Sequence, residues 1–135
     1  LFQQLKDSNR KATLVLGKPE KSENQQFGNL KVVSHLNALQ LNQEMSNAKI
    51  VVSRSGYSTI RGLAILNKKA IFIPTPGQTE QLYLATHFDR NKIALAVHQE
   101  SLNLEKAIEK SNHFSGFEGD DTNNNWNDLF KIFEE

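Results

Sequence analysis

The sequence contains no cysteine, which excludes disulfide bonds and thiolate chemistry. Its histidines lie too far apart along the chain to suggest a ligand cluster of the kind that binds zinc. They are His35, His87, His98 and His113. We therefore expect no metal site and no bound cofactor.

Long apolar runs are also missing, and none approaches the roughly 18 residues that a membrane-spanning helix needs. The N-terminus lacks the charged and apolar regions of a signal peptide. The 16 basic and 15 acidic residues are interleaved, so no patch favours nucleic acid or an anionic membrane. These absences predict a cytoplasmic domain that does not bind nucleic acid and that binds any anion through local groups.

The length of 135 residues fits one domain with a sizeable core. The sequence opens LFQQLK, without an initiator methionine, and Leu1, Phe2 and Leu5 have the spacing of one apolar helix face. We expect a fragment that begins inside a helix, either a natural subunit or a piece cut from a longer chain.

Short runs rich in β-branched residues predict strands. Most are apolar at nearly every position, as in IVV at 50–52 and AIFI at 70–73, which is typical of parallel strands covered on both faces. The predicted strands are Ala12 to Gly17, Leu30 to Ser34, Lys49 to Ser53, Ala70 to Pro74 and Lys92 to Val97.

Between these runs, apolar residues at helical spacing predict helices. Alternating strands and helices predict an α/β fold, a doubly wound and Rossmann-like open parallel sheet with helices on both faces. Such sheets bind ligands at the carboxyl ends of their strands. The predicted helices are Asn37 to Asn47, Ser58 to Leu66, Glu80 to Arg90 and Ser101 to Lys110.

Beyond residue 110 the composition becomes polar and glycine-containing. We therefore predict an α/β domain over residues 1–110 and a loop over 111–125. Helical spacing of apolar residues then predicts an amphipathic helix over 126–135. Docking of this helix on its own domain is the favoured interpretation, and contact with another domain is the alternative. The apolar residues are Trp126, Leu129, Phe130 and Phe133.

The stretch AKIVVSRSGYSTI predicts a strand, a tight turn at Ser55 and Gly56, and a helix. A helix N-terminus has unpaired N–H groups and a partial positive charge, so it can bind a diphosphate. Gly56 permits close approach of the backbone, and the hydroxyls of Ser55, Ser58 and Thr59 can donate to phosphate oxygens. Arg54 can add charge-assisted bonds where it faces the ligand. The alternative is that Ser58 merely caps the helix.

A second polar segment follows the next predicted strand, in AIFIPTPGQTEQLYLA. In a parallel sheet this loop would lie at the same edge as the Ser55 turn. A carboxylate beside a carboxamide suits the hydroxyls of a sugar, and Glu80 and Gln81 supply that pair. The alternative is a solvated first helical turn, in which Glu80 interacts favourably with the helix dipole.

Together, SRSGYSTI and IPTPGQTEQLYLA resemble the donor-binding half of GT-B glycosyltransferases, in particular the bacterial peptidoglycan UDP-N-acetylglucosaminyltransferases and related UDP-sugar transferases. The resemblance covers Lys11 to Lys110 and includes LKVVSHLNALQ, where family members contact the nucleobase. It implies diphosphate binding by Arg54, Ser55, Gly56, Tyr57, Ser58 and Thr59, sugar binding by Gln78, Glu80 and Gln81, and nucleobase contact by His35 and Leu36.

The sequence departs from this family in two ways. The family usually has a glutamate that binds the ribose hydroxyls, and Gly62 stands at that position. The first strand of the donor domain with its Gly-rich loop, the acceptor domain and the catalytic base would all precede Leu1. The resemblance therefore implies an acceptor-binding N-terminal domain or subunit as partner, with any membrane association through that part.

The function implied by the resemblance is the donor-binding half of an inverting, metal-independent hexosyltransferase with a UDP-sugar, GlcNAc-like, as donor substrate. This half would be inactive alone. A fragment of a UDP-sugar epimerase is an alternative, because epimerases of this kind share the architecture. A noncatalytic nucleotide-sugar-binding or interaction module is another, because a fold alone does not imply a function.

Overall fold

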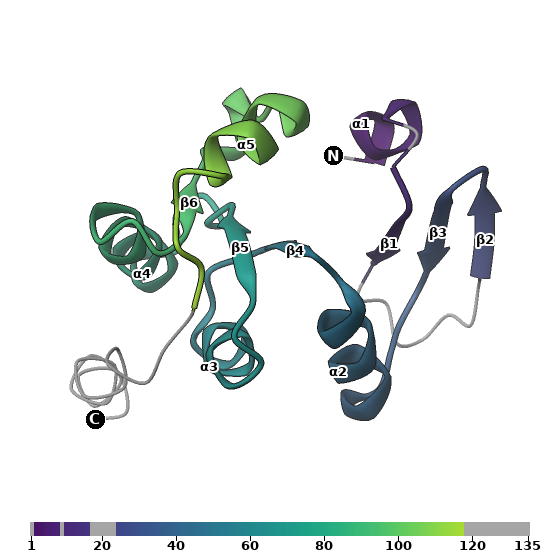
Figure 1. Ribbon diagram of the computed structural model, residues 1–135, viewed down its shortest axis with the longest axis horizontal. Helices are drawn as coiled ribbons and strands as arrows, with labels where there is room; N and C mark the ends of the chain where they lie inside the picture. The colour runs from purple at the N-terminus through teal and green to yellow at the C-terminus, as the bar shows by residue number, and fades with distance from the viewer. Residues whose placement is uncertain (1, 9, 17–23, 118–135) are drawn as a thin grey trace.

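The computed structural model describes residues 2–8, 10–16 and 24–117 (Figure 1). Strands and helices alternate along most of this part of the chain, which confirms the predicted α/β class. The elements are α1 (Phe2–Asp7), β1 (Ala12–Val15), β2 (Asn24–Phe27), β3 (Leu30–Val33), α2 (Ala38–Asn47), β4 (Ile50–Ser53), α3 (Tyr57–Ile65), β5 (Lys69–Phe72), α4 (Thr79–Arg90), β6 (Leu95–Ala96), the 3-10 turn η1 (Gln99–Ser101) and α5 (Leu104–Ser111).

The strands form two sheets in the described residues, with orders β1-β3-β2 and β4-β5-β6. In the second sheet all strands are parallel, as predicted. In the first, β1 and β3 are parallel, whereas β2 pairs antiparallel with β3. A continuous sheet was the expectation, and it is divided because β1 and β4 do not hydrogen-bond to each other.

Each predicted strand is present, and each predicted helix within the described residues is present with shifted ends. The helix at Asn37 begins at Ala38 because Asn37 forms a capping box with Gln40. The last described helix begins at Leu104 rather than Ser101, because the preceding residues form η1. The predicted helix over 126–135 lies outside the described residues.

Side chains on the two faces of β5 alternate between two apolar clusters, so this strand is covered on both faces as its sequence predicted. Phe72 packs with Ile60 and Leu63 of α3 and with Leu84 and Phe88 of α4. On the opposite face lies a second cluster, formed by Ile71, Leu95, Ala107 and Phe114. The two clusters therefore fix the positions of the helices on either face of β5.

The segment after α5 was predicted as a polar loop, and in its described part it contains no helix or strand. It is nevertheless anchored, because Phe117 is 2% exposed and packs in the first cluster. Gly116 makes the approach possible: its φ is +75°, and an added Cβ would lie 3.2 Å from the Cα of Lys69. No helix in the described ranges is long and apolar enough to cross a membrane.

Candidate functional site

The candidate site lies where β4 and β5 end. Ser53 and Phe72 are register partners in adjacent parallel strands, and the N–H of Ile73 donates to the carbonyl of Ser53 at 2.9 Å. The loops that follow, 54–56 and 73–78, therefore leave the sheet at the same edge. This confirms the predicted juxtaposition of the two polar segments.

Side chains join the two loops into one unit. The Arg54 guanidinium donates to the carbonyl of Ile73 at 3.0 Å, and the Ser55 hydroxyl donates to the carbonyl of Gln81 at 2.7 Å. The N–H of Thr75 in turn donates to Oε1 of Gln81 at 2.8 Å. Both loops and the start of α4 are thereby held in a fixed relation, which is what a preorganised binding edge requires.

Gly56 is the N-cap of α3, with φ −75° and ψ 150° and without a side-chain cap. The alternative in which Ser58 caps this helix is therefore wrong, since the helix begins at Tyr57. Nothing lies within 4 Å of a Cβ built on Gly56, so the space beside the first turn of α3 is open. A helix N-terminus with no side-chain cap and open space beside it is suited to an anionic ligand.

The hydroxyls of this segment have different surroundings. Ser55 is fully buried and its hydroxyl is committed to α4, so its side chain supports the loops. Ser58 is exposed and Thr59 is half-buried. Tyr57 is half-buried against the first cluster, and its hydroxyl accepts a hydrogen bond from Arg61 at 3.0 Å. Ser58 is thus the hydroxyl best placed to meet a ligand.

The start of α4 carries the predicted sugar-binding residues. Gln78 is the N-cap without a side-chain cap, and both Gln78 and Glu80 are exposed. Gln81 is half-buried, and its Oε1 accepts from Thr75. The structure therefore brings these residues to the edge that carries Gly56. Their contact with a sugar, like the diphosphate role of 54–59, stays a prediction.

His35 and Leu36 follow β3 and precede α2. His35 is exposed and Leu36 is half-buried. Because β3 belongs to the other sheet, no strand pairing joins this loop to the one at Arg54. The nucleobase role of the two residues stays a prediction. Gly62 lies on α3, where an added Cβ would meet Met45 Cε at 3.7 Å, an ordinary contact distance.

No group of three histidine or acidic residues within the described ranges has the arrangement of a metal site. A shallow hollow of about 280 Å³ lies between α1 and the β2–β3 turn, and it contains none of the predicted site residues. It is lined by Leu5, Lys6, Arg10, Phe27, Gly28, Asn29 and Leu30.

The fold and the site define an α/β domain with a ligand-binding edge at the carboxyl ends of parallel strands. Residues 2–130 match the model of the glycosyltransferase family 28 C-terminal domain, and the chain belongs to this family. Over 65 residues it is 37% identical to the UDP-N-acetylglucosamine--N-acetylmuramyl-(pentapeptide) pyrophosphoryl-undecaprenol N-acetylglucosamine transferase of Rickettsia prowazekii (strain Madrid E). The match covers 47% of this chain and 17% of that relative.

Proposed function

We propose that this chain is the donor-binding half of a glycosyltransferase that transfers a hexosyl group from a UDP-sugar to an acceptor. The observation that carries the proposal is the N-terminus of α3, which has no side-chain cap and opens onto free space at Gly56. Membership of a glycosyltransferase family supports it. The relative is named for UDP-N-acetylglucosamine, which favours a GlcNAc-like donor.

In this proposal the diphosphate lies against the first turn of α3. Backbone N–H groups and the Ser58 hydroxyl donate to its oxygens, and the helix dipole stabilises the negative charge that develops on the UDP leaving group. Arg54 adds a charge-assisted bond, since only one of its nitrogens is engaged by Ile73. These groups make a metal ion unnecessary for stabilising the leaving group.

The remaining donor contacts follow from the neighbouring loops. The Glu80 carboxylate accepts hydrogen bonds from the sugar hydroxyls, and the Gln81 carboxamide donates to them. His35 and Leu36 contact the base. The acceptor and the catalytic base belong to an N-terminal domain or subunit, and any peripheral membrane contact is made by that part. We place the enzyme in the cytoplasm, where nucleotide sugars are available as donors.

Calorimetric titration with UDP, UMP, GDP and UDP-GlcNAc tests the proposal. UDP should bind at least about tenfold more tightly than UMP, because the second phosphate contacts α3. Equal affinity for UDP and UMP would remove α3 from the site, and equal affinity for UDP and GDP would remove uracil recognition. An epimerase would instead convert UDP-GlcNAc without an acceptor, and no observation on this chain favours that activity.

A further inference from the structure

Arg61 is the single charged residue of α3, whose sequence is YSTIRGLAI. It lies four residues after Tyr57, the first residue of the helix, and residues at that spacing meet on one helix face. The side chains of a helix also tilt towards its N-terminus. The Arg61 side chain is therefore directed back along α3 towards the first turn, where Gly56 opens onto free space.

Two contacts hold the Arg61 guanidinium beside Tyr57. Its Nη1 donates to the Tyr57 hydroxyl at 3.0 Å, and its central carbon lies 5.6 Å from the centroid of the Tyr57 ring. The ring is half-buried and packs against the cluster that contains Ile60 and Leu63. Because a fixed ring holds the guanidinium, a ligand that binds to it loses less affinity to the ordering of this side chain.

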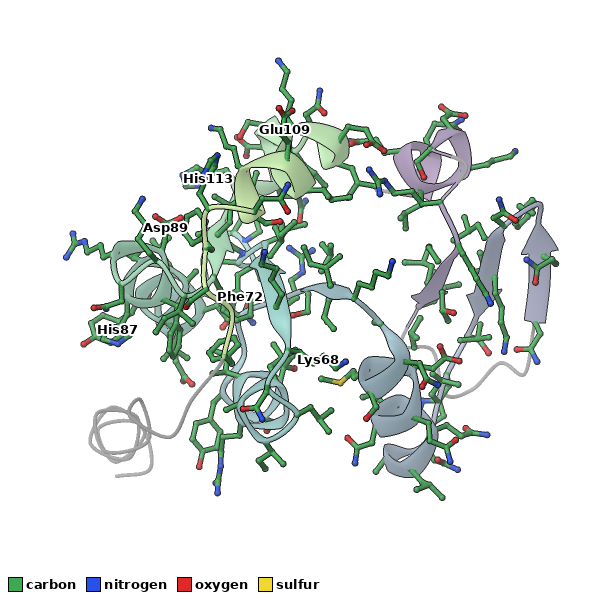
Figure 2. The ribbon with its side chains drawn as sticks, viewed as in Figure 1. Lys68, Phe72, His87, Asp89, Glu109 and His113 are labelled. Carbon is green, nitrogen blue, oxygen red and sulfur yellow. The ribbon has the colours of Figure 1, made fainter. Side chains whose placement is uncertain are left out.

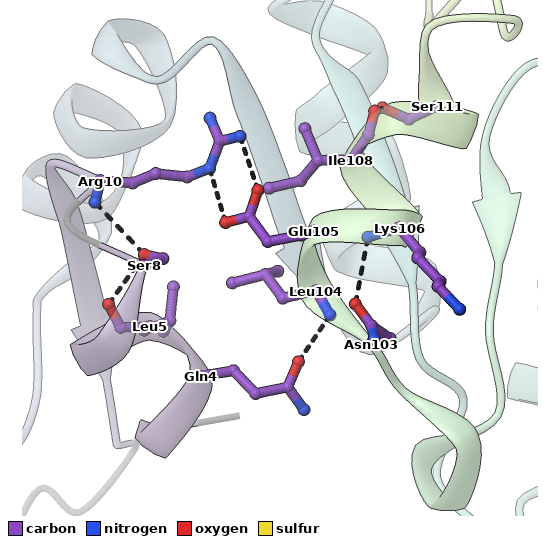
Figure 3. A network of polar contacts seen from close by, with 10 residues as sticks. All are labelled: Gln4, Leu5, Ser8, Arg10, Asn103, Leu104, Glu105, Lys106, Ile108 and Ser111. Carbon is purple, nitrogen blue, oxygen red and sulfur yellow. Dashed lines mark hydrogen bonds and ion pairs between the residues drawn. The ribbon is translucent and has the colours of Figure 1, made fainter.

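The charge of Arg61 is not compensated in the way that the charge of Arg10 is. Arg10 donates from Nε and Nη2 to the Glu105 carboxylate, at 3.1 and 2.9 Å (Figure 3). Arg61 pairs with no carboxylate among the described residues, and its side chain is exposed. The guanidinium donors that Tyr57 does not engage are therefore available to an anion.

The position of this charge is unfavourable for α3 by itself. The N-terminal end of a helix carries a partial positive charge, so acidic residues are favoured there. Both α4 and α5 follow this rule, with Glu80 and Glu105 in their first turns. The first turn of α3 contains no acidic residue, and Arg61 adds positive charge next to it. Because departures from local rules concentrate at functional sites, a bound anion is the expected compensation.

We propose that Arg61, held in place by the Tyr57 hydroxyl, is a further donor-binding residue that contacts the diphosphate of the nucleotide sugar. The inference rests on the proposed function and adds a second arginine to that site. Arginine suits this contact because its planar fork of N–H donors matches the oxygens of a phosphate. The Tyr57 hydroxyl is then a positioning group, since it acts on the ligand through Arg61.

Calorimetric titration of Arg61→Ala with UDP and UMP tests the contact. UDP affinity should fall at least about tenfold, and the preference for UDP over UMP should shrink, because the diphosphate offers the guanidinium more charge. Arg61→Lys keeps the charge without the fork of donors and should recover part of the loss. Arg90→Ala is the matched control, because Arg90 is an exposed arginine at the opposite end of α4 from the binding edge. It should leave both affinities unchanged.

Tyr57→Phe tests the positioning role. This substitution keeps the ring that packs against the first cluster and removes only the hydroxyl that accepts from Arg61. UDP affinity should fall about threefold. In the Arg61→Ala background the same substitution should have no further effect, because the hydroxyl acts through Arg61. A further loss in that background would overturn the positioning role.

The unaltered protein separates failure of this inference from failure of the proposed function. If it binds UDP no more tightly than UMP, the proposed function fails. If it prefers UDP and Arg61→Ala binds UDP as tightly as Arg90→Ala does, only the role of Arg61 fails. A lowered midpoint of urea unfolding in Arg61→Ala, with UDP affinity unaltered, would also overturn it, since the contact with Tyr57 would then only stabilise α3.

Discussion

At the scale of single residues, Gly56 is the position where the binding hypothesis can be separated from folding. Its φ is in the ordinary negative range, and an added side chain meets open space. We expect Gly56→Val to reduce UDP affinity by at least about tenfold while lowering the free energy of unfolding by no more than about 1 kcal/mol. Calorimetry and chemical denaturation measure the two quantities.

Gly62→Ala is the matched control for Gly56→Val, because Gly62 lies inside the same helix. Its Cβ makes an ordinary contact with Met45, and alanine in place of glycine stabilises a helix interior by roughly 0.5–1 kcal/mol. UDP affinity should not change. Unaltered UDP binding by the Gly56→Val protein would show that the diphosphate lies elsewhere.

Ser55 and Ser58 are expected to separate stability from binding. Ser55→Ala removes the hydrogen bond that the fully buried Ser55 hydroxyl donates to the carbonyl of Gln81, and should cost about 1–2 kcal/mol of unfolding free energy. Ser58→Ala should leave stability within about 0.5 kcal/mol and lower UDP affinity about tenfold, because Ser58 is exposed. Reversed effects, with Ser58→Ala destabilising, would contradict this division.

The sequence alone placed both serines in one motif and could not divide their roles. The spacing SRSGYST predicts a strand, a turn and a helix from local rules. Whether a hydroxyl faces a ligand or the next helix depends on α4, which begins more than 20 residues later. The bond from Ser55 to Gln81 is therefore a tertiary contact that local spacing does not encode.

At the scale of elements, the first turn of α4 provides a test of sugar recognition. Glu80 is exposed, so Glu80→Ala should leave stability within about 0.5 kcal/mol. It should abolish the difference in affinity between UDP-GlcNAc and UDP while leaving UDP itself unaffected. Glu80→Gln, which keeps the shape and one acceptor oxygen, should retain part of that difference. A difference that persists in Glu80→Ala would refute the sugar contact.

The last turn of α4 carries His87 (Figure 2). Partial burial of the imidazole lowers its pKa, which gives a pH prediction. The folded state therefore favours the neutral imidazole, whereas the unfolded chain binds a proton near pH 6.5. The contribution of His87 to stability is fully present above that pH and is lost as the pH falls towards the lower folded pKa. Denaturation measured between pH 7.5 and 5 brackets the ordinary histidine pKa. Over this range, His87→Gln should lose less stability than the unaltered protein. Equal losses would exclude this role.

Most elements could be predicted because their signals are local. Runs such as IVV and AIFI identify β4 and β5, and Asn37 marks the start of α2. The strand β2 was missed because NQQF lacks β-branched residues, and it forms only by pairing with β3 around a turn in which Gly28 has φ +60°. Its pairing with an apolar neighbour, rather than its own propensity, makes it a strand.

At the scale of the whole molecule, the separation between domain and loop near residue 110 is less sharp than the composition suggested. The described part of that loop is tied to the sheet by backbone bonds from Ser115 to Lys92, Gly116 to Ile93 and Phe117 to Lys68. Most residues of SNHFSGF are polar or small, which is why its composition predicts a loop, but its two phenylalanines are buried in the fold. The segment belongs to the core that supports the binding edge.

Phe117→Ala measures that dependence. The Phe117 ring lies 5.2 Å from the ring of Phe88 and 6.1 Å from that of Phe72, centroid to centroid, so its removal leaves a cavity between α4 and β5. We expect a loss of about 3–5 kcal/mol in the free energy of unfolding, measured by chemical denaturation. His113→Ala, an exposed position in the same segment, should change it by no more than about 0.5 kcal/mol. Because the cluster contains residues of both α3 and α4, Phe117→Ala should also weaken UDP binding at temperatures where the protein is still folded. Unchanged stability of Phe117→Ala would mean that the chain folds independently of residues beyond α5.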